Sequence, residues 1–402
     1  TAIILFYMNK NCSNCDKTAK KTKLGFLKNL VTKYHTVMFT LKFIPNFRAI
    51  FRFVKCYVKV NLFKKDQIRF VEIFVTLACN ARCDFCSNNL FTNKKGNIST
   101  EKYLGIIDEC ATLGVPVVCL IGGEPLLYKD LNRLISKINH HGMVSMIATN
   151  GYLLTEEKVK ELAEAGLTSI TVSLHSINEE EHDNILKLKG AYVKAFKAKE
   201  YCDKYGMVFQ LASVASHHDF TNGNFDKMVE FVEKKKIPLS VNAIIPTGGA
   251  IKHKDDLLTA EDVKKLNEIS YKSNYVSTHL TNNFFGFGCP AGNSYLGINA
   301  TGEMFPCFFM PISLGNVHNM TLKDAWDKAR SNPVFKKKYK MCYAGISREF
   351  IEKFMDPVFK FEKVPIAIED HPAYDAAKGG LPELEFPETE DAVNYQSSKT
   401  AN

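Results

Sequence analysis

Three cysteines in one short segment are the residues best suited to carry chemistry. Cys79, Cys83 and Cys86 are spaced C-x3-C-x2-C within LACNARCDFCSNN, directly after an apolar stretch. A tight loop with this spacing can direct three thiolates at one centre, where they bind zinc or an iron–sulfur cluster. Zinc usually takes a fourth protein ligand, and the sequence offers none nearby. A [4Fe–4S] cluster held by three cysteines keeps one iron free to chelate an amine and a carboxylate. Three buried thiols without metal are the alternative.

A second set of cysteines lies later in the chain. Cys289 and Cys307 lie around a predicted hairpin whose turn is NATGEM, and Cys342 follows a predicted helix over 321–335. These three thiols are candidates for a second metal site, and buried thiols in a degenerate domain are the alternative.

The remaining cysteines are less informative. Cys12 and Cys15 form an isolated C-x2-C pair, a redox pair or half of a metal site that nothing nearby completes. The others fall in apolar patterns and are predicted to be core residues: Cys56, Cys110, Cys119 and Cys202. Twelve cysteines, no recognisable signal peptide and no apolar run of eighteen residues predict a reducing, cytoplasmic location and no transmembrane helix.

Six strands that alternate with helices are expected to position the first cysteine set. The strands are predicted at 68–77, 115–121, 143–149, 169–174, 207–214 and 238–245. Thr100 and Thr155 lie at expected N-caps, and glycines such as Gly114 lie where helices should end. Near-continuous apolar strands alternating with helices predict a parallel sheet covered on its outer face. Six such units form six-eighths of a (β/α)8 barrel, whose chemistry lies at the C-terminal ends of the strands.

The first cysteine segment resembles a known signature. CNARCDFC is similar to the C-x3-C-x-aromatic-C signature of the radical S-adenosylmethionine (SAM) superfamily, with Phe85 at the aromatic position, and the similarity extends over residues 68–250. The resemblance implies a partial (β/α)6 barrel and a [4Fe–4S] cluster on Cys79, Cys83 and Cys86, with SAM on the open iron. It also implies reductive cleavage of SAM to a 5′-deoxyadenosyl radical that abstracts hydrogen from a substrate, with electrons from a donor such as flavodoxin or ferredoxin.

Further positions resemble places where this superfamily binds SAM. The IGGEP segment at the end of the second predicted strand is similar to the GGEP motif, which contacts the SAM amino group. The resemblance carries over to these candidate cofactor-binding residues: Gly122, Gly123, Glu124, Pro125, Asn150 and Ser173. Short polar residues are common at strand ends, so a structural role is the alternative for Asn150 and Ser173. No side chain is singled out as catalytic.

The second cysteine set resembles an auxiliary-cluster domain. C-x12-G-x4-C around Cys289 and Cys307, followed by LGNV at 314–317, is similar to the start of a SPASM or twitch domain. Such domains bind one or two further [4Fe–4S] clusters, but a complete SPASM domain has more cysteines downstream and none follows Cys342 here. The resemblance therefore implies one auxiliary cluster on Cys289, Cys307 and Cys342. Its fourth ligand is a substrate, a non-cysteine side chain or another cysteine.

Charge is distributed unevenly along the chain. The net charge is +9, and residues 1–70 carry fifteen Lys/Arg against two acids, a net +13. Residues 369–391 carry eight acids against one lysine, a net −7 in a proline-containing tail. The basic segment alternates cations with large apolar residues, which fits an anionic membrane surface, an acidic partner or a helical extension packed on the barrel. No helix-turn-helix or zinc-finger pattern is present, which argues against nucleic acid as a partner.

These features predict an α/β protein with four regions. They are a basic helical extension at 1–67, a radical SAM (β/α)6 barrel at 68–250, a SPASM/twitch-like domain at 251–345 and a C-terminal extension with the acidic tail at 346–402.

The predicted function is hydrogen abstraction from a peptide or protein, because relatives with auxiliary-cluster domains often modify peptides. No discrete leader-binding pattern precedes the barrel, which weakens this hypothesis. One alternative is a small-molecule or lipid substrate, with the enzyme peripheral to a membrane. Another is a non-catalytic iron–sulfur or zinc scaffold or electron carrier, against which the ligand-shaped IGGEP turn argues.

Overall fold

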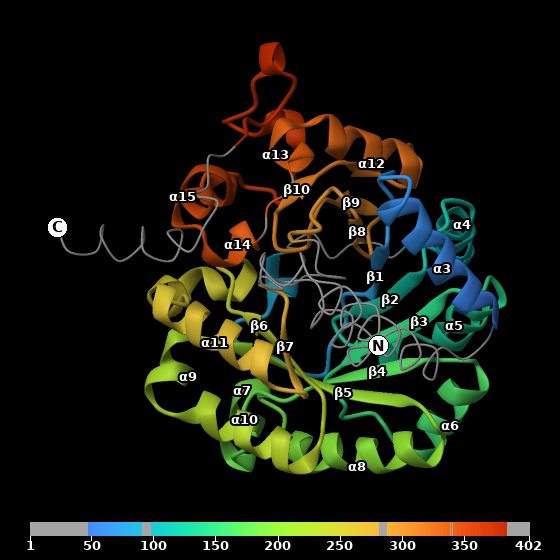
Figure 1. Cartoon of the computed structure of the whole chain (residues 1–402), viewed down its shortest axis with the longest axis vertical. Coiled ribbons are helices and arrows are strands. Elements are labelled where there is room, and N and C mark those ends of the chain that lie inside the picture. Colours follow the sequence, from blue (N-terminus) through green and yellow to red (C-terminus); the bar gives the residue numbers. More distant parts are fainter. Residues whose placement is uncertain (1–46, 91–97, 281–287, 338, 340, 384–402) are drawn as a thin grey trace, which may run out of the picture.

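A ten-stranded, mostly parallel sheet curved into an open ring forms the centre of the molecule (Figure 1). The computed structural model describes residues 47–90, 98–280, 288–337, 339 and 341–383. Cys12, Cys15 and the acidic tail from residue 384 onward lie outside these ranges. The order of the strands is β11-β9-β8-β1-β2-β3-β4-β5-β6-β7, so β11 and β7 are the two edges.

The first six strands follow the predicted succession closely. They are β1 (Phe70–Thr76), β2 (Val117–Gly122), β3 (Val144–Thr149), β4 (Ser169–Ser173), β5 (Val208–Ala215) and β6 (Leu239–Ala243). Each pairs in parallel with the next, and a seventh parallel strand, β7 (Val276–Thr278), follows β6. The α/β, partial (β/α)6 barrel fold is therefore confirmed.

The predicted hairpin near the second cysteine set is also present, and it joins the same sheet. β8 (Tyr295–Ile298) pairs in parallel with β1, and β9 (Glu303–Phe305) pairs antiparallel with β8. β11 (Gly315–Asn316) extends this side antiparallel to β9. Strands within 251–345 thus continue the barrel sheet past β1, while the limits of the two domains stay a prediction.

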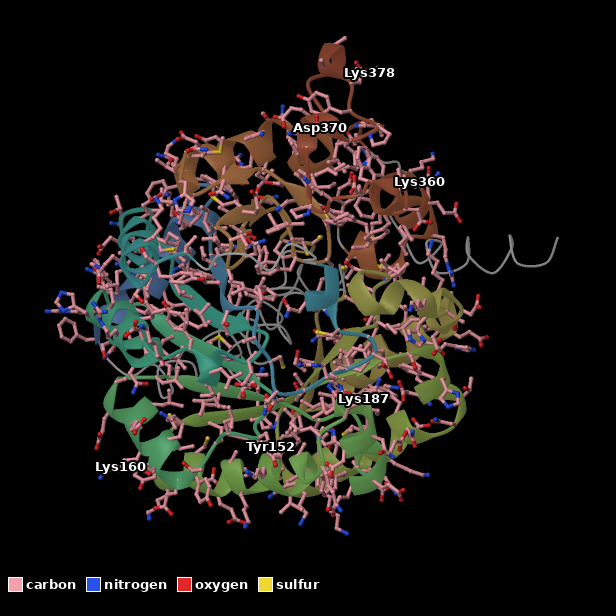
Figure 2. The ribbon with its side chains drawn as sticks, turned by 180° about the vertical axis from the view of Figure 1, so that it is seen from behind. Tyr152, Lys160, Lys187, Lys360, Asp370 and Lys378 are labelled. Atoms are coloured by element: carbon pink, nitrogen blue, oxygen red, sulfur yellow. The ribbon has the colours of Figure 1, made fainter. Side chains whose placement is uncertain are left out.

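Helices cover the outside of the ring (Figure 1). They are α4 (Thr100–Thr112), α5 (Leu131–His140), α6 (Glu156–Glu164), α7 (Glu179–Leu186), α8 (Ala191–Lys204), α9 (His217–Thr221), α10 (Asn224–Lys235) and α11 (Ala260–Lys272). Thr155 caps α6 as predicted, but the N-cap of α4 is Ser99 rather than Thr100, because the Ser99 hydroxyl accepts the amide of Lys102. Charged side chains such as Lys160 and Lys360 point outward at the periphery (Figure 2).

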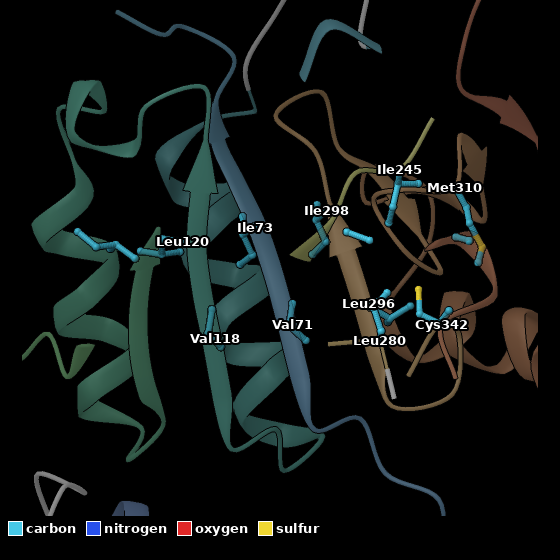
Figure 3. Close-up of a cluster of buried hydrophobic side chains, with 14 of the residues drawn as sticks. Val71, Ile73, Val118, Leu120, Ile245, Leu280, Leu296, Ile298, Met310 and Cys342 are labelled. Carbon is cyan, nitrogen blue, oxygen red and sulfur yellow. The ribbon is translucent and has the colours of Figure 1, made fainter. Parts of the chain in front are cut away.

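The alternation of side chains along each strand separates two apolar layers. In β1, Val71, Ile73 and Val75 face the helices, whereas Phe70 and Phe74 face the barrel interior. The outer layer is one continuous cluster that extends from the barrel to Met310 and Cys342 in the C-terminal region (Figure 3).

Helix α3 (Phe47–Asn61) packs against the N-terminal ends of β1, β2 and β3. Its Ala49 and Phe53 belong to the interior apolar cluster. The guanidinium of Arg52 donates to the carbonyl oxygens of Ala111 and His141, both at 3.0 Å, at the ends of α4 and α5. These carbonyls precede β2 and β3, so α3 lies at the N-terminal ends of the strands. The predicted packing of the basic extension on the barrel is thus found for this helix.

The C-terminal region packs beside β9 and β6. The helix predicted over 321–335 is two helices, α12 (Leu322–Ser331) and α13 (Pro333–Lys336), because Pro333 cannot continue α12. The other elements are α14 (Tyr343–Ile346), α15 (Arg348–Phe350), β10 (Ile312–Ser313) and β12 (Ile366–Ala367), the last two paired with each other. Across the described ranges, no helix is long and apolar enough to cross a membrane.

Candidate functional site

The first three cysteines share the loop between β1 and the short helix η2 (Ser87–Leu90). Cys79, Cys83 and Cys86 are all half-buried. The amide of Ala81 donates to Sγ of Cys79 (3.4 Å), and the amide of Cys86 donates to the carbonyl of Cys83 (3.3 Å). The loop therefore turns tightly at the C-terminal end of β1, where the chemistry of a parallel barrel is located.

Segments that follow β6 and β4 hold this loop in place. The amide of Gly249 donates to the carbonyl of Cys86 (3.0 Å), and a Cβ at Gly249 would lie 1.9 Å from the carbonyl oxygen of Asp84. Only glycine permits this approach of two backbones. The ring of Phe85 meets the ring of His175 edge-on at 5.0 Å, so the aromatic position of the signature anchors the loop.

The electrostatics of the loop suit a bound metal. Burial and the neighbouring thiols Cys86 and Cys79 raise the pKa of Cys83 to about 12, and burial raises the pKa of Cys79. Such thiols are neutral near pH 7 and become ligands when a metal stabilises their thiolates.

The donor set fits an iron–sulfur cluster. Thiolates select zinc or iron–sulfur chemistry, and a cubane takes one thiolate on each of three separate irons. Within the ranges that the structure describes, no three His, Cys, Asp or Glu side chains converge on the position of one metal ion.

The IGGEP segment is joined directly to the start of the cysteine loop. The amide of Gly123 donates to the carbonyl of Thr76, and the amide of Glu124 donates to the carbonyl of Ala78, both at 2.8 Å. A Cβ at Gly122 would lie 2.5 Å from the carbonyl oxygen of Thr76. The two glycines thus allow β2 to approach the strand that leads into Cys79, and this places GGEP beside the thiols.

The side chain of Glu124 connects the end of β2 to the end of β3 rather than facing solvent. Its side chain is fully buried and accepts hydrogen bonds from the hydroxyl of Thr149 (2.7 Å) and the amides of Asn150 (2.9 Å) and Leu126 (3.1 Å). Burial raises the pKa of Glu124, and these three hydrogen bonds oppose that effect. Pro125 follows as the buried first residue of η3 (Pro125–Leu127).

Asn150 links this network to the first cysteine. Its side-chain amide donates to Oδ1 of Asn80 (2.7 Å) and lies 4.0 Å from Sγ of Cys79. Ser173 is the partly exposed last residue of β4, on the inward face with Thr171. The structure therefore gathers the predicted residues from Gly122 to Pro125 and Asn150 around the cysteine loop. SAM contact by these residues and by Ser173 stays a prediction.

Gly123→Ala is expected to damage the site, because the new Cβ would lie 2.2 Å from the carbonyl oxygen of Ala78. We expect an affinity for SAM at least about tenfold lower and a loss of about 1–3 kcal/mol in the free energy of unfolding. Calorimetric SAM titration and urea unfolding measure both. Gly105→Ala in α4 is the matched control, since nothing lies within 4 Å of its added Cβ. Equal SAM affinities for the two variants would contradict the prediction.

The second cysteine set is brought together from three distant segments. The thiols of Cys289 and Cys342 share a hydrogen bond, and Cys307 lies close enough to interact electrostatically with both. The amide of Cys342 donates to the carbonyl of Leu280 (2.6 Å), next to β7, and Figure 3 shows these two residues near each other.

These thiols also suit a metal. The hydrogen bond with Cys289 and burial raise the pKa of Cys342, and burial raises the pKa of Cys307. A cluster of desolvated thiols is the ligand type that iron–sulfur clusters use.

Glu72 is a candidate that the sequence reasoning missed. It is the acid within the apolar strand β1 and lies on the inward register with Phe70 and Phe74. The hydroxyl of Tyr295 donates to its carboxylate. Burial raises the pKa of Glu72 to about 7, against the opposing effect of that hydrogen bond. A carboxyl that titrates near neutrality inside the barrel is a candidate proton acceptor. In the sequence, the feature that indicates it is a single acidic residue within an otherwise apolar strand.

Glu72→Gln is expected to flatten the pH dependence of stability. The folded pKa of about 7 exceeds the ordinary 4.5, so the folded protein binds more protons between these values. Its free energy of unfolding therefore falls as pH rises from about 4.5 to 7, by up to about 3 kcal/mol. Glutamine keeps an acceptor for Tyr295 and removes this fall. The neighbouring Tyr295, Cys119 and Cys307 have pKa values raised above their ordinary ones and do not titrate in this window.

Urea unfolding near pH 5 and near pH 7.5 measures the effect of Glu72→Gln. The exposed Glu101→Gln serves as the control and should keep the wild-type pH dependence. A Glu72→Gln variant whose stability falls with pH as steeply as that of the wild type would contradict the prediction.

The fold and the two thiol sites define a class of iron–sulfur proteins built on a partial (β/α)6 barrel. The family profile of the radical SAM superfamily matches residues 73–234, and that of the iron–sulfur cluster-binding SPASM domain matches residues 289–344. The chain belongs to the radical SAM superfamily and carries a SPASM domain. It is an enzyme that uses a [4Fe–4S] cluster and SAM, with auxiliary iron–sulfur binding in the SPASM domain, so the non-catalytic scaffold hypothesis is dropped.

Several known proteins are similar to this chain. The AdoMet-dependent heme synthase of Methanosarcina barkeri is 25% identical over 67% of this chain and 84% of its own length. The PqqA peptide cyclase of Rhizobium meliloti is 27% identical over 63% of this chain and 72% of its own. The crystal structure of Streptococcus suis SuiB bound to precursor peptide SuiA superposes with a TM-score of 0.57 at 17% identity, covering 80% of this chain and 78% of SuiB, a likeness of fold.

Proposed function

We propose that this radical SAM enzyme abstracts hydrogen from a peptide or protein substrate. The observation that carries the proposal is the combination of a three-cysteine loop at the barrel mouth with a second set of three mutually interacting thiols beside it. A PqqA peptide cyclase is similar to 63% of this chain, at 27% identity. The edges β7 and β11 do not pair with each other, so the sheet is open on the side where Cys289 and Cys342 lie.

The residues of the first site divide into ligands and positioning groups. Cys79, Cys83 and Cys86 would hold the [4Fe–4S] cluster, which together with SAM supplies a radical able to take hydrogen from an unactivated carbon. Backbone groups of Gly122 and Gly123 lie next to the thiols and offer contacts to the SAM amino group. Glu124 acts as a positioning residue, because it ties the GGEP turn to Asn150.

The barrel floor would keep water away from the radical. Phe74 and Phe308 meet at 4.3 Å between ring centroids, and Phe53 of α3 packs in the same cluster. An apolar layer at this depth leaves the mouth as the route for substrate and limits quenching by solvent.

The second thiol set would hold one auxiliary [4Fe–4S] cluster on Cys289, Cys307 and Cys342. Its place beside the barrel suits acceptance of an electron from the substrate after hydrogen abstraction, or anchoring of the substrate at an open iron.

An acidic electron donor such as flavodoxin or ferredoxin would reduce the first cluster. Arg82, Lys187 and Lys252 lie exposed at or near the cysteine loop, where Lys187 pairs with Asp84. A basic rim of this kind attracts acidic partners and makes their association sensitive to salt.

A tetrapyrrole is the second candidate for the substrate. Heme synthases are among the most similar relatives, with identities of 22–25% over 63–67% of this chain. The peptide hypothesis and this small-molecule hypothesis assume the same cofactor chemistry. They differ only in the substrate that binds at the C-terminal end of the barrel.

The experiment that separates the two candidates uses the full chain, reconstituted anaerobically with iron and sulfide. Formation of 5′-deoxyadenosine is measured with dithionite or flavodoxin as reductant, in the presence of host-cell extract fractions or Fe-coproporphyrin. We expect an extract fraction to stimulate SAM cleavage and to lose this effect after protease treatment. Stimulation by the porphyrin, or by a protease-resistant fraction, would instead favour a small molecule and contradict the peptide proposal.

A further inference from the structure

Helix α3 is apolar on two opposite sides, and the barrel covers only one of them. Ala49, Phe53 and Cys56 are buried against the barrel. Phe47, Phe51, Val54 and Val58 recur at i, i+4, i+7 and i+11, which places them on one line along the opposite side. The exposed fractions are 76% for Phe47, 69% for Phe51 and 48% for Val54. Packing within the described fold therefore explains the inner side of α3 and leaves the outer side unexplained.

Cations accompany the exposed stripe, which continues beyond the helix. Leu62 and Phe63 are 71% and 68% exposed and follow α3 directly. Arg48 and Lys55 are exposed on the helix, and Lys64 and Lys65 are exposed after it. Residues 47–65 contain no aspartate or glutamate. The outward surface of 47–65 thus combines large apolar side chains with positive charge alone.

The barrel holds α3 rigidly in this orientation. Arg52 donates to the carbonyl oxygens of Ala111 and His141, and Arg48 donates to the carbonyl of His140 (3.4 Å). A Cβ at Gly142 would lie 2.6 Å from Cβ of Arg48, so the helix and the loop before β3 are in close contact. The stripe is consequently presented to the outside on a fixed helix.

From this charge and apolar pattern we propose that the surface formed by residues 47–65 docks on an anionic lipid bilayer. A helix lying in the plane of the membrane buries aromatic and aliphatic side chains at the boundary of the headgroups, while Lys and Arg contact anionic lipid. A second copy of the chain fits less well, since two such surfaces would bring like charges together. The negative charge of the lipid headgroups complements the positive charge of the exposed cations of residues 47–65.

Docking through α3 sets the orientation of the enzyme. The helix lies at the N-terminal ends of the strands, whereas Cys79, Cys83 and Cys86 follow the C-terminal end of β1. The cofactor site would therefore face away from the bilayer. This geometry describes an anchored enzyme that takes substrate from the aqueous side, rather than one that takes lipid from the membrane.

Vesicle flotation of the full chain tests the proposal. We expect binding to vesicles of phosphatidylcholine with about one-third phosphatidylglycerol, weakened by salt, and little binding to phosphatidylcholine alone. The double variant Phe47→Ser/Phe51→Ser should lower the partition coefficient at least about tenfold, and Lys55→Glu about tenfold. Matched controls are Tyr271→Ser on α11 and Lys227→Glu on α10, which change exposed residues elsewhere and should bind as the wild type does.

The other outcomes each overturn the proposal. Failure of the wild-type chain to bind anionic vesicles, or equal binding to neutral ones, removes the anionic bilayer as the partner. Wild-type binding by the Phe47/Phe51 double variant assigns the contact to another part of the chain. A dimer that forms without lipid and is lost in the double variant would make the surface a self-interface. SAM cleavage in solution should be equal in all variants, so the result is independent of the substrate proposed above.

Discussion

Cys83→Ala should reduce formation of 5′-deoxyadenosine to background, a loss of at least about 1000-fold in SAM cleavage. The reason is the ligand count, because two thiolates from one loop cannot hold the cluster in place of three. The main contact of Cys83 within the loop is its carbonyl, which accepts the amide of Cys86 and is unchanged in alanine. Anaerobic reconstitution, dithionite reduction and chromatography of the nucleoside products measure the effect, and iron content should fall by about four atoms per chain.

The matched control for Cys83→Ala is Cys202→Ala. Cys202 is a fully buried free thiol in α8, away from both thiol sets. It should keep the wild-type iron content and SAM cleavage, with a stability loss of about 1 kcal/mol. SAM cleavage by Cys83→Ala at a rate within tenfold of Cys202→Ala would refute the assignment of the first cluster.

Cys342→Ala should separate SAM cleavage from product formation. Cleavage in the absence of substrate should stay within about twofold of the wild type, since the first thiol set is intact, while product formation should be lost. Cys342 shares a hydrogen bond with Cys289 and interacts electrostatically with Cys307, so its removal takes one ligand from the proposed auxiliary cluster. Iron content measures the loss of about four atoms per chain, and electron paramagnetic resonance should show one reduced cluster instead of two.

Two comparisons make the Cys342 test decisive. Cys307→Ala removes a different thiol of the same set and should behave identically, which guards against a local packing defect at Cys342. Cys110→Ala, a buried thiol in α4, should leave iron and turnover unchanged. Unchanged iron content and turnover in both Cys342→Ala and Cys307→Ala would mean that the second set is structural.

The parts of the fold that could be predicted from the sequence are those that depend on local patterns of apolar and polar residues. The six strands from 68 to 245 show continuous apolar runs between amphipathic helices, and the structure places each strand end within two residues of its predicted limit. Two details differ from the prediction. The helix predicted over 321–335 breaks before Pro333, and α4 is capped by Ser99 rather than by its neighbour Thr100. Helix ends depend on single residues, so local patterns predict them less well than whole helices.

Contacts between distant segments could not be predicted in the same way. Glu72 meets Tyr295 across 223 positions, because β8 joins the sheet beside β1 rather than forming a sheet of its own. Gly249, in the segment after β6, donates its amide to the carbonyl of Cys86 in the cysteine loop. The Gly248-Gly249 pair in the sequence does not by itself indicate this contact. No local periodicity specifies which strand becomes the neighbour of which.

The sequence by itself determined the first candidate metal site, since Cys79, Cys83 and Cys86 lie within one loop and their spacing keeps them close together. Tertiary structure decided the second, because Cys289, Cys307 and Cys342 meet only when the hairpin, the end of β7 and α14 have packed together. It also decided which side of α3 is buried. Both sides of that helix are apolar, and only the barrel selects Phe53 over Phe51 for the interior.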